Sequence, residues 1–106
     1  MLKSATGADL DVLRALRVVL DPELGIDIVS LGLVYGATRD GARAHVVMTM
    51  TSPACPLGEV LIEDAKAAVT SLVPGVREAA VELVFEPRWT PERMTPEARE
   101  QLGYPE

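Results

Sequence analysis

Cys55 is the only cysteine of the 106 residues, and it lies between Pro53 and Pro56. A β-branched, strand-like run ends just before it and a helical pattern starts just after it, which predicts that the thiol lies at a helix N-terminus. The helix dipole and free N–H groups there favour a thiolate, which attacks electrophiles and binds soft metals. The alternative is a small buried hydrophobe or an inert cap residue.

Two pairs of polar residues are further candidates for the same chemistry. Asp21 and Glu23 flank a proline, and Thr51 and Ser52 lie shortly before Cys55. The acidic pair could simply close a helix C-terminal turn, but the helix dipole disfavours carboxylates there, which favours a role in steering a metal ion or binding the two hydroxyls. Thr51 and Ser52 could be strand-end and turn formers, or they could donate hydrogen bonds to a sulfur atom.

Three other side chains carry weaker signals. His45 is the only histidine and falls mid-strand on the face predicted to point away from the core, where we expect a solvated or interface residue rather than a metal ligand. A thiol enzyme would need a base for Cys55, and His45 has no evident orienting partner, so we expect no enzymatic activity. Trp89 and Arg93 are expected to anchor the C-terminal tail, with docking of a partner as the alternative role.

Composition limits the class of protein. A chain of this length is expected to form one domain, and its 48% hydrophobic content can fill a core. The net charge of −6 disfavours nucleic-acid binding. No apolar run approaches the roughly 20 residues that span a bilayer, so we expect no membrane association. A single cysteine forms no internal disulfide and we see no signal peptide, so we expect a protein of the reducing cytoplasm.

The N-terminal region predicts one helix. Residues 1–7 are expected to be flexible, and the helix is expected to start near Thr6 in a capping-box-like sequence. It should end at Asp21-Pro22, because the residue before a proline disfavours the α region. Its apolar stripe is expected to consist of four leucines: Leu10, Leu13, Leu16 and Leu20.

A β-hairpin is predicted next. Strands are expected at about 33–39 and 42–51, joined at Asp40-Gly41 by a two-residue type I′ turn. Alternation in the second strand separates two faces. The predicted core face consists of Ala44, Val46, Met48 and Met50. The predicted outward face consists of Arg43, His45, Val47, Thr49 and Thr51.

The C-terminal half predicts a second helix at about 56–72 and a third strand at about 76–85. The helix is expected to bury a stripe of Leu57, Leu61, Ala65, Ala68 and Leu72, flanked by Val60 and Val69. In the tail, residues 86–106, Thr90-Pro91 and Thr95-Pro96 each resemble an N-cap followed by a helix-compatible proline. Two short helical turns that pack on the body are therefore expected there.

The element order α-β-β-α-β, with a short helical tail, predicts an α+β fold in a single domain of residues 1–106. The strand–helix–strand connection makes the third strand parallel to the second, with a right-handed crossover. The result is a two-layer α/β sandwich with helices on one face of a small mixed sheet. The other face, which carries Val34, Val47 and Val84, is expected to be covered by the tail or by a second subunit.

Four segments stand out together along the sequence. They are Asp21-Pro22-Glu23, Ser30-Leu31-Gly32-Leu33-Val34-Tyr35, Met48-Thr49-Met50-Thr51-Ser52-Pro53 with Cys55-Pro56, and Trp89-Thr90-Pro91-Glu92-Arg93-Met94. This ordered set resembles the MIP18 family, also called DUF59, which includes SufT-like and PaaD-like proteins. The resemblance covers about residues 8–103.

The resemblance implies the fold of the iron–sulfur cluster assembly domain and a role in cluster assembly or delivery to apoproteins. By motif match, the family's acidic pair falls on Asp21 and Glu23, and its reactive cysteine on Cys55. Its threonine pair falls on Thr51 and Ser52, where serine keeps the hydroxyl. PaaD-type members carry a longer, cysteine-bearing C-terminal extension that is not seen here, so a PaaD-like accessory subunit of an oxygenase pathway is the alternative.

One thiolate per chain limits the mechanism, because iron–sulfur clusters commonly need four ligands. A homodimer would supply two thiolates, and a small thiol or a partner the rest. We therefore predict a non-enzymatic iron–sulfur maturation factor in which Cys55 transiently contacts iron, a cluster or a thiol. Its expected partners are client apoproteins and cluster-assembly proteins. The alternative is an adaptor that binds clients without carrying a cluster.

Overall fold

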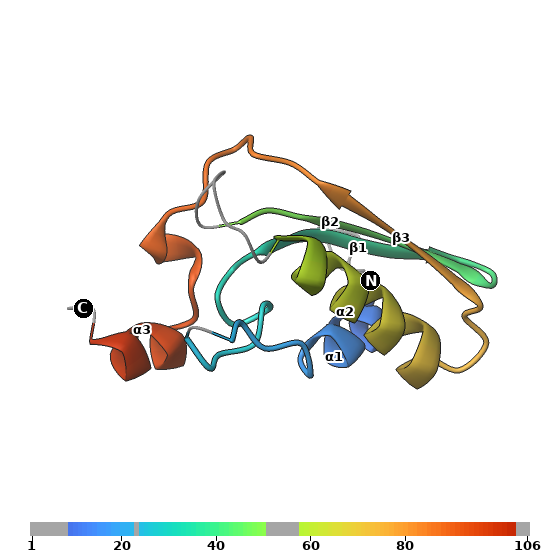
Figure 1. Ribbon diagram of the computed structural model, residues 1–106, viewed down its shortest axis with the longest axis horizontal. Helices are drawn as coiled ribbons and strands as arrows, with labels where there is room; N and C mark the ends of the chain where they lie inside the picture. Colours follow the sequence, from blue (N-terminus) through green and yellow to red (C-terminus); the bar gives the residue numbers. More distant parts are fainter. Residues whose placement is uncertain (1–8, 23, 51–57, 104–106) are drawn as a thin grey trace.

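A computed structural model describes residues 9–22, 24–50 and 58–103. Its centre is a three-stranded sheet in the order β1-β2-β3 (Figure 1). β1 (Val34–Asp40) pairs antiparallel with β2 (Arg43–Met48), which pairs in parallel with β3 (Glu78–Leu83). The predicted α+β class, the mixed sheet and the parallel third strand are confirmed.

α1 (Leu10–Leu16) and α2 (Gly58–Leu72) cover the same face of the sheet, which gives the predicted two layers (Figure 1). The core lies between these layers, and its largest fully buried side chains come from both helices, the strands and the loop before β1. They include Val12, Leu16, Ile28, Leu31, Leu33, Val46, Met48, Leu61 and Val69. None of the described helices is long and apolar enough to cross a bilayer.

The ends of α1 differ from the prediction. Asp9 is its N-cap, with the carboxylate accepting a hydrogen bond of 3.0 Å from the Val12 N–H, so the predicted start near Thr6 is wrong. The helix already ends at Leu16, because the Arg17 N–H bonds to the Arg14 carbonyl in a tightened last turn. The Asp21-Pro22 step therefore does not stop it.

The apolar stripes of both helices are also shifted. The buried face of the first segment is Val12, Ala15, Leu16 and Val19, whereas Leu10 and Leu20 are 66% and 52% exposed. Residues 10–20 are apolar on more than one face, so periodicity alone could not choose between them. In α2, Leu61, Ala65, Ala68 and Val69 are buried as a helical stripe, but Val60 and Leu72 are about half exposed, and Val73 is buried just beyond the helix.

The hairpin forms with a different turn from the one predicted. Asp40 pairs with Arg43, so Gly41 and Ala42 are the loop residues. Gly41 has φ +64°, and no non-glycine residue in the described chain has a positive φ, which matches a type II′ turn rather than type I′. The predicted core face of β2 is confirmed: Ala44, Val46, Met48 and Met50 are all buried.

Thr49 was expected on the outward face of this strand and is instead fully buried. The β1–β2 ladder ends at the pair Val34 and Met48, so Thr49 lies beyond it, and its N–H donates to the carbonyl of the buried Leu33 at 2.8 Å. Simple alternation fails where the strand runs into packed loops.

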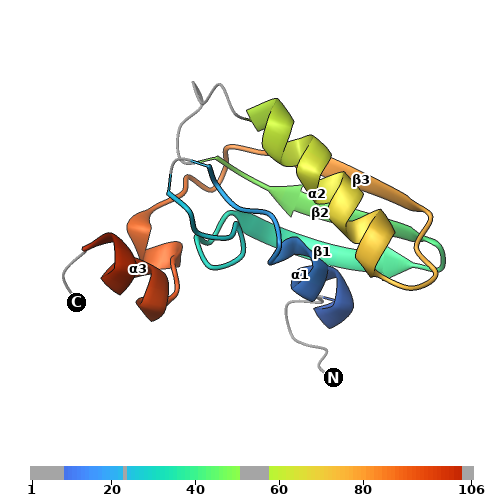
Figure 2. The ribbon, with the colours of Figure 1, turned by 60° about the horizontal axis from the view of Figure 1, so that its bottom comes forward.

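The tail forms η1 (Pro91–Arg93) and α3 (Pro96–Leu102), which begin after Thr90 and Thr95 as predicted. The Thr95 hydroxyl caps α3 by accepting from the Ala98 N–H at 3.1 Å. Figures 1 and 2 show α3 at the end of the molecule opposite the β1–β2 hairpin turn. The tail therefore lies next to the loop that leads into β1.

Candidate functional site

Three of the predicted site residues, Asp21, Trp89 and Arg93, lie within the described structure. The remaining four fall outside the described residues, namely Glu23, Thr51, Ser52 and Cys55. The candidate site is therefore built from the described residues that border them.

Asp21 is 93% buried by its surroundings, with an exposed fraction of 7%, and it organises a tight loop. Its carboxylate accepts a hydrogen bond from the Leu24 N–H at 3.2 Å, and its backbone carbonyl accepts one from Gly25 at 2.7 Å. Gly25 has φ +70°, a conformation that glycine adopts without strain. Because α1 ends at Leu16, the expected conflict between this carboxylate and a helix dipole does not exist. Asp21 has a local structural role in addition to any role in a site.

Two buried residues border the Cys55 segment. Met50 follows β2 and is 4% exposed, and the buried Gly58 is the first residue of α2. A Cβ on Gly58 would lie 3.9 Å from the Met50 Cε, so the C-terminal end of β2 and the start of α2 meet here. The helix start predicted next to the thiol is present, within three residues of Cys55 in the sequence.

Thr49 brings a polar atom into the packed interior one residue before Met50. Its Oγ1 is buried and has no hydrogen-bond partner in the described part of the chain. Sequence reasoning missed this residue as a site neighbour. Its place within the motif of residues 48–53 was the one available signal.

The tail contacts the loop before β1 through three connections. The Trp89 indole Nε1 donates to the Leu31 carbonyl at 2.7 Å, and the Thr95 N–H donates to the Ser30 carbonyl at 2.9 Å. Gly32, with φ +79°, lies so close to Arg93 that a Cβ would collide with the arginine backbone. The side chain of Trp89 thus holds the tail on the loop of residues 30–32.

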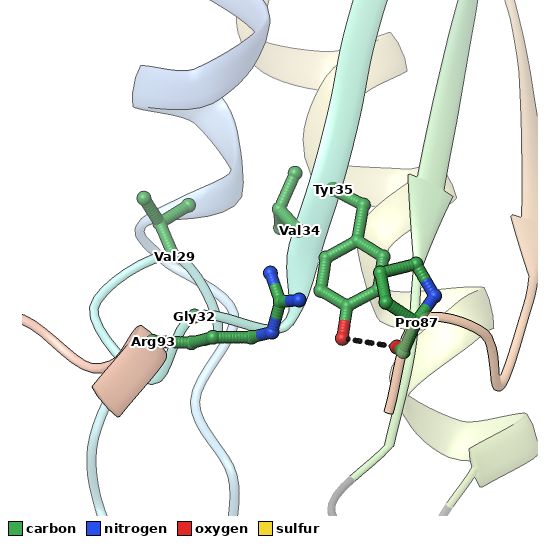
Figure 3. A pocket seen from close by; sticks show the side chains of 6 residues that line it. All are labelled: Val29, Gly32, Val34, Tyr35, Pro87 and Arg93. Carbon is green, nitrogen blue, oxygen red and sulfur yellow. Dashed lines mark hydrogen bonds between the residues drawn. The ribbon is translucent and has the colours of Figure 1, made fainter. Parts of the chain in front are cut away.

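A pocket of about 500 Å³ opens where this loop, β1 and the tail meet (Figure 3). Its lining consists of Val29, Gly32, Val34, Tyr35, Pro87 and Arg93. The Tyr35 hydroxyl donates to the Pro87 carbonyl at 2.7 Å, and the Arg93 guanidinium carbon lies 4.6 Å from the centre of the Tyr35 ring. Tyr35 was not predicted as a site residue, although it ends one of the four recognised segments.

Metal-binding potential is low in the part of the chain that the structure describes. No group of three or more His, Cys, Asp or Glu side chains there could hold a metal ion. The exposed His45 forms a pair with Glu82, with 3.4 Å between His45 Nε2 and Glu82 Oε1. Chemistry with iron or sulfur would therefore depend on Cys55.

The sequence model of a family described as "Iron-sulfur cluster assembly protein" matches residues 9–83, more than half of the chain. The chain belongs to this family. It is 42% identical to the Fe-S protein maturation auxiliary factor YitW of Bacillus subtilis, over 88% of this chain and 91% of that protein. It is also 42% identical to the Fe-S protein maturation auxiliary factor SufT of Staphylococcus aureus, over 81% of this chain and 98% of that protein.

A solved structure of a DUF59 domain from Bacillus anthracis has the same fold as this family member. It superposes with a TM-score of 0.83 at 44% identity, covering 87% of this chain and 88% of the other. The resemblance to the DUF59 family is therefore confirmed. The family match spans the positions of Asp21, Glu23 and Cys55 and ends before Trp89 and Arg93.

Proposed function

We propose that this protein is an auxiliary factor for the maturation of iron–sulfur proteins. One observation carries the proposal: the sequence aligns along more than four fifths of its length with curated factors of that description, and along nearly all of theirs. The family membership and the shared fold support it. The function is a non-enzymatic one, with iron or a cluster as cargo.

Cys55 is the residue to which we assign contact with that cargo. It precedes the first turn of α2, where the helix dipole and unpaired N–H groups stabilise a thiolate. One thiolate satisfies a quarter of the usual ligand set, so we propose transient binding completed by a second subunit, a small thiol or a client protein. Asp21, Glu23, Thr51 and Ser52 would surround the thiol.

The partners in this proposal are client apoproteins and other cluster-assembly proteins. A cytoplasmic location and a homodimer remain predictions from the sequence. An anaerobic titration with iron and sulfide, followed by absorption spectroscopy, tests the role of Cys55. We expect wild type to develop the charge-transfer bands of thiolate-bound iron, and Cys55→Ala to lose them.

A cellular assay completes the test. In cells that lack the gene, wild type should restore the activity of iron–sulfur enzymes and Cys55→Ala should not. Glu100→Gln, an exposed substitution in α3, is the matched control and should behave as wild type. Identical iron uptake by wild type and Cys55→Ala, together with full maturation of clients by the variant, would refute the assignment.

An adaptor that carries no cluster is the second candidate function. Both helices lie on one face of the sheet, so the opposite face exposes Arg43, His45 and Glu82 at its centre. The tail adds the exposed Arg93 beside that sheet. If purified apoclients bind Cys55→Ala as tightly as wild type and no iron is ever taken up, the adaptor is the correct description. The PaaD-like and thiol-enzyme alternatives have no specific observation in their favour.

A further inference from the structure

Arg93 is a cation without an acidic partner in a partly apolar pocket. It is the one charged residue among those that line the pocket beside Tyr35. No ion pair in the described part of the chain involves it. In a protein with 16 acidic and 10 basic residues, this local positive site contrasts with the overall charge.

The walls of this pocket are fixed before any ligand arrives. The hydrogen bond from the Tyr35 hydroxyl to the Pro87 carbonyl joins β1 to the tail. Gly32 has no side chain to fill the space, and the Arg93 backbone lies directly against it. Figure 3 shows the guanidinium reaching from the tail toward the Tyr35 ring. A preformed pocket loses little conformational entropy on binding.

We propose that this pocket binds a carboxylate with a short apolar body. A guanidinium held over an aromatic ring keeps its in-plane N–H donors available, and these match a carboxylate in a bidentate arrangement. Val29, Val34 and Pro87 offer the apolar contact for the rest of the ligand. The carboxylate comes from a free organic acid or from an acidic side chain of a partner protein. The site does not depend on Cys55 or on cluster handling.

The test is an NMR titration of the full chain, following backbone amide shifts. Sodium propionate is the free-acid probe, and the α-amide of N-acetylglutamate is the side-chain probe. Few ligand atoms limit the affinity, so we expect Kd values on the order of 1–10 mM. Saturable shifts should centre on Gly32, Tyr35 and Arg93. Propionamide, which has the same shape without charge, and inorganic phosphate should give neither the pattern nor saturation.

Three variants decide the outcome. Arg93→Gln should weaken binding at least about tenfold, because it removes the charge-assisted pair. Arg93→Lys keeps the charge but not the fork of donors, so it should bind between wild type and Arg93→Gln. Arg88→Gln, on an exposed arginine that does not line the pocket, should bind as wild type.

Binding of either probe that is lost in Arg93→Gln supports the proposal, and the tighter probe identifies the source of the carboxylate. Shifts that are equal for propionate and propionamide would overturn it. So would binding that is unchanged in both Arg93 variants, or no saturable shift with either probe. Because Cys55 is unchanged in every variant, a negative result leaves the proposed maturation role untouched.

Discussion

The indole Nε1 of Trp89 donates a hydrogen bond of 2.7 Å to the backbone carbonyl of Leu31, 58 positions earlier in the sequence. Leu31 is fully buried in the core. The bond therefore connects the tail directly to the loop that leads into β1. It also satisfies a carbonyl at a position with little access to water.

Removing this bond should destabilise the fold. Trp89→Phe keeps an aromatic ring but leaves the Leu31 carbonyl without its donor, which should cost about 1–3 kcal/mol in the free energy of unfolding. Urea denaturation measures the change. Arg88→Gln, at the neighbouring exposed position, should stay within about 0.5 kcal/mol of wild type. Equal stability of the two variants would show that the Trp89 bond contributes nothing.

Gly32 and Gly25 form a matched pair for the second prediction. Both have positive φ, +79° and +70°, but a Cβ on Gly32 would collide with the Arg93 backbone, whereas one on Gly25 meets nothing within 4 Å. Gly25→Ala should cost about 1–2 kcal/mol from backbone conformation alone. Gly32→Ala should cost about 1–3 kcal/mol more, because the tail must move away. Thermal and urea unfolding of both variants give the comparison, and equal costs would contradict the close approach.

Local signals were sufficient for much of the fold. Threonine followed by proline correctly marked both short helices of the tail, because capping and proline geometry act within a few residues. The ends and buried face of α1 were not predictable in this way. The segment from Leu10 to Leu20 is apolar on more than one side, so tertiary packing decides which face is buried.

The candidate site divides along the same line. The motif around Cys55 and the acidic residue Asp21 could be identified from the sequence, because residue type and order carry that signal. The pocket could not, because its contacts join positions that are far apart in the chain. Tyr35 meets Pro87 across 52 positions, and no local periodicity encodes such a contact.

Thr49 provides the third prediction, because its buried hydroxyl lacks a hydrogen bond within the described structure. Thr49→Val replaces the hydroxyl with a methyl group of similar size and should be neutral or stabilising by up to about 1 kcal/mol. Thr95→Val is the contrasting variant, because the Thr95 hydroxyl caps α3. It should destabilise by about 1 kcal/mol. Urea unfolding that gives Thr49→Val an equal loss would show that its hydroxyl has a partner.

The carboxylate of Glu92 provides the fourth prediction. A hydrogen bond from its own backbone N–H, one from the Thr90 hydroxyl and the charge of Arg99 lower the pKa of Glu92 from its ordinary value of 4.5. A lowered pKa in the folded state stabilises the fold above pH 4.5, and this contribution is lost as the pH falls through the folded-state pKa. Thr90→Val should therefore raise the pKa of Glu92 and reduce that contribution.

The hydroxyl of Thr90 makes no capping bond to η1, so the substitution should leave the short helix in place. NMR titration of the Glu92 side-chain carboxyl carbon measures the pKa in wild type and variant. Arg99→Gln should raise the pKa less than Thr90→Val, because the charge of Arg99 is the smaller cause. A Glu92 pKa that is unchanged or lower in Thr90→Val would rule out the hydroxyl as a donor to this carboxylate.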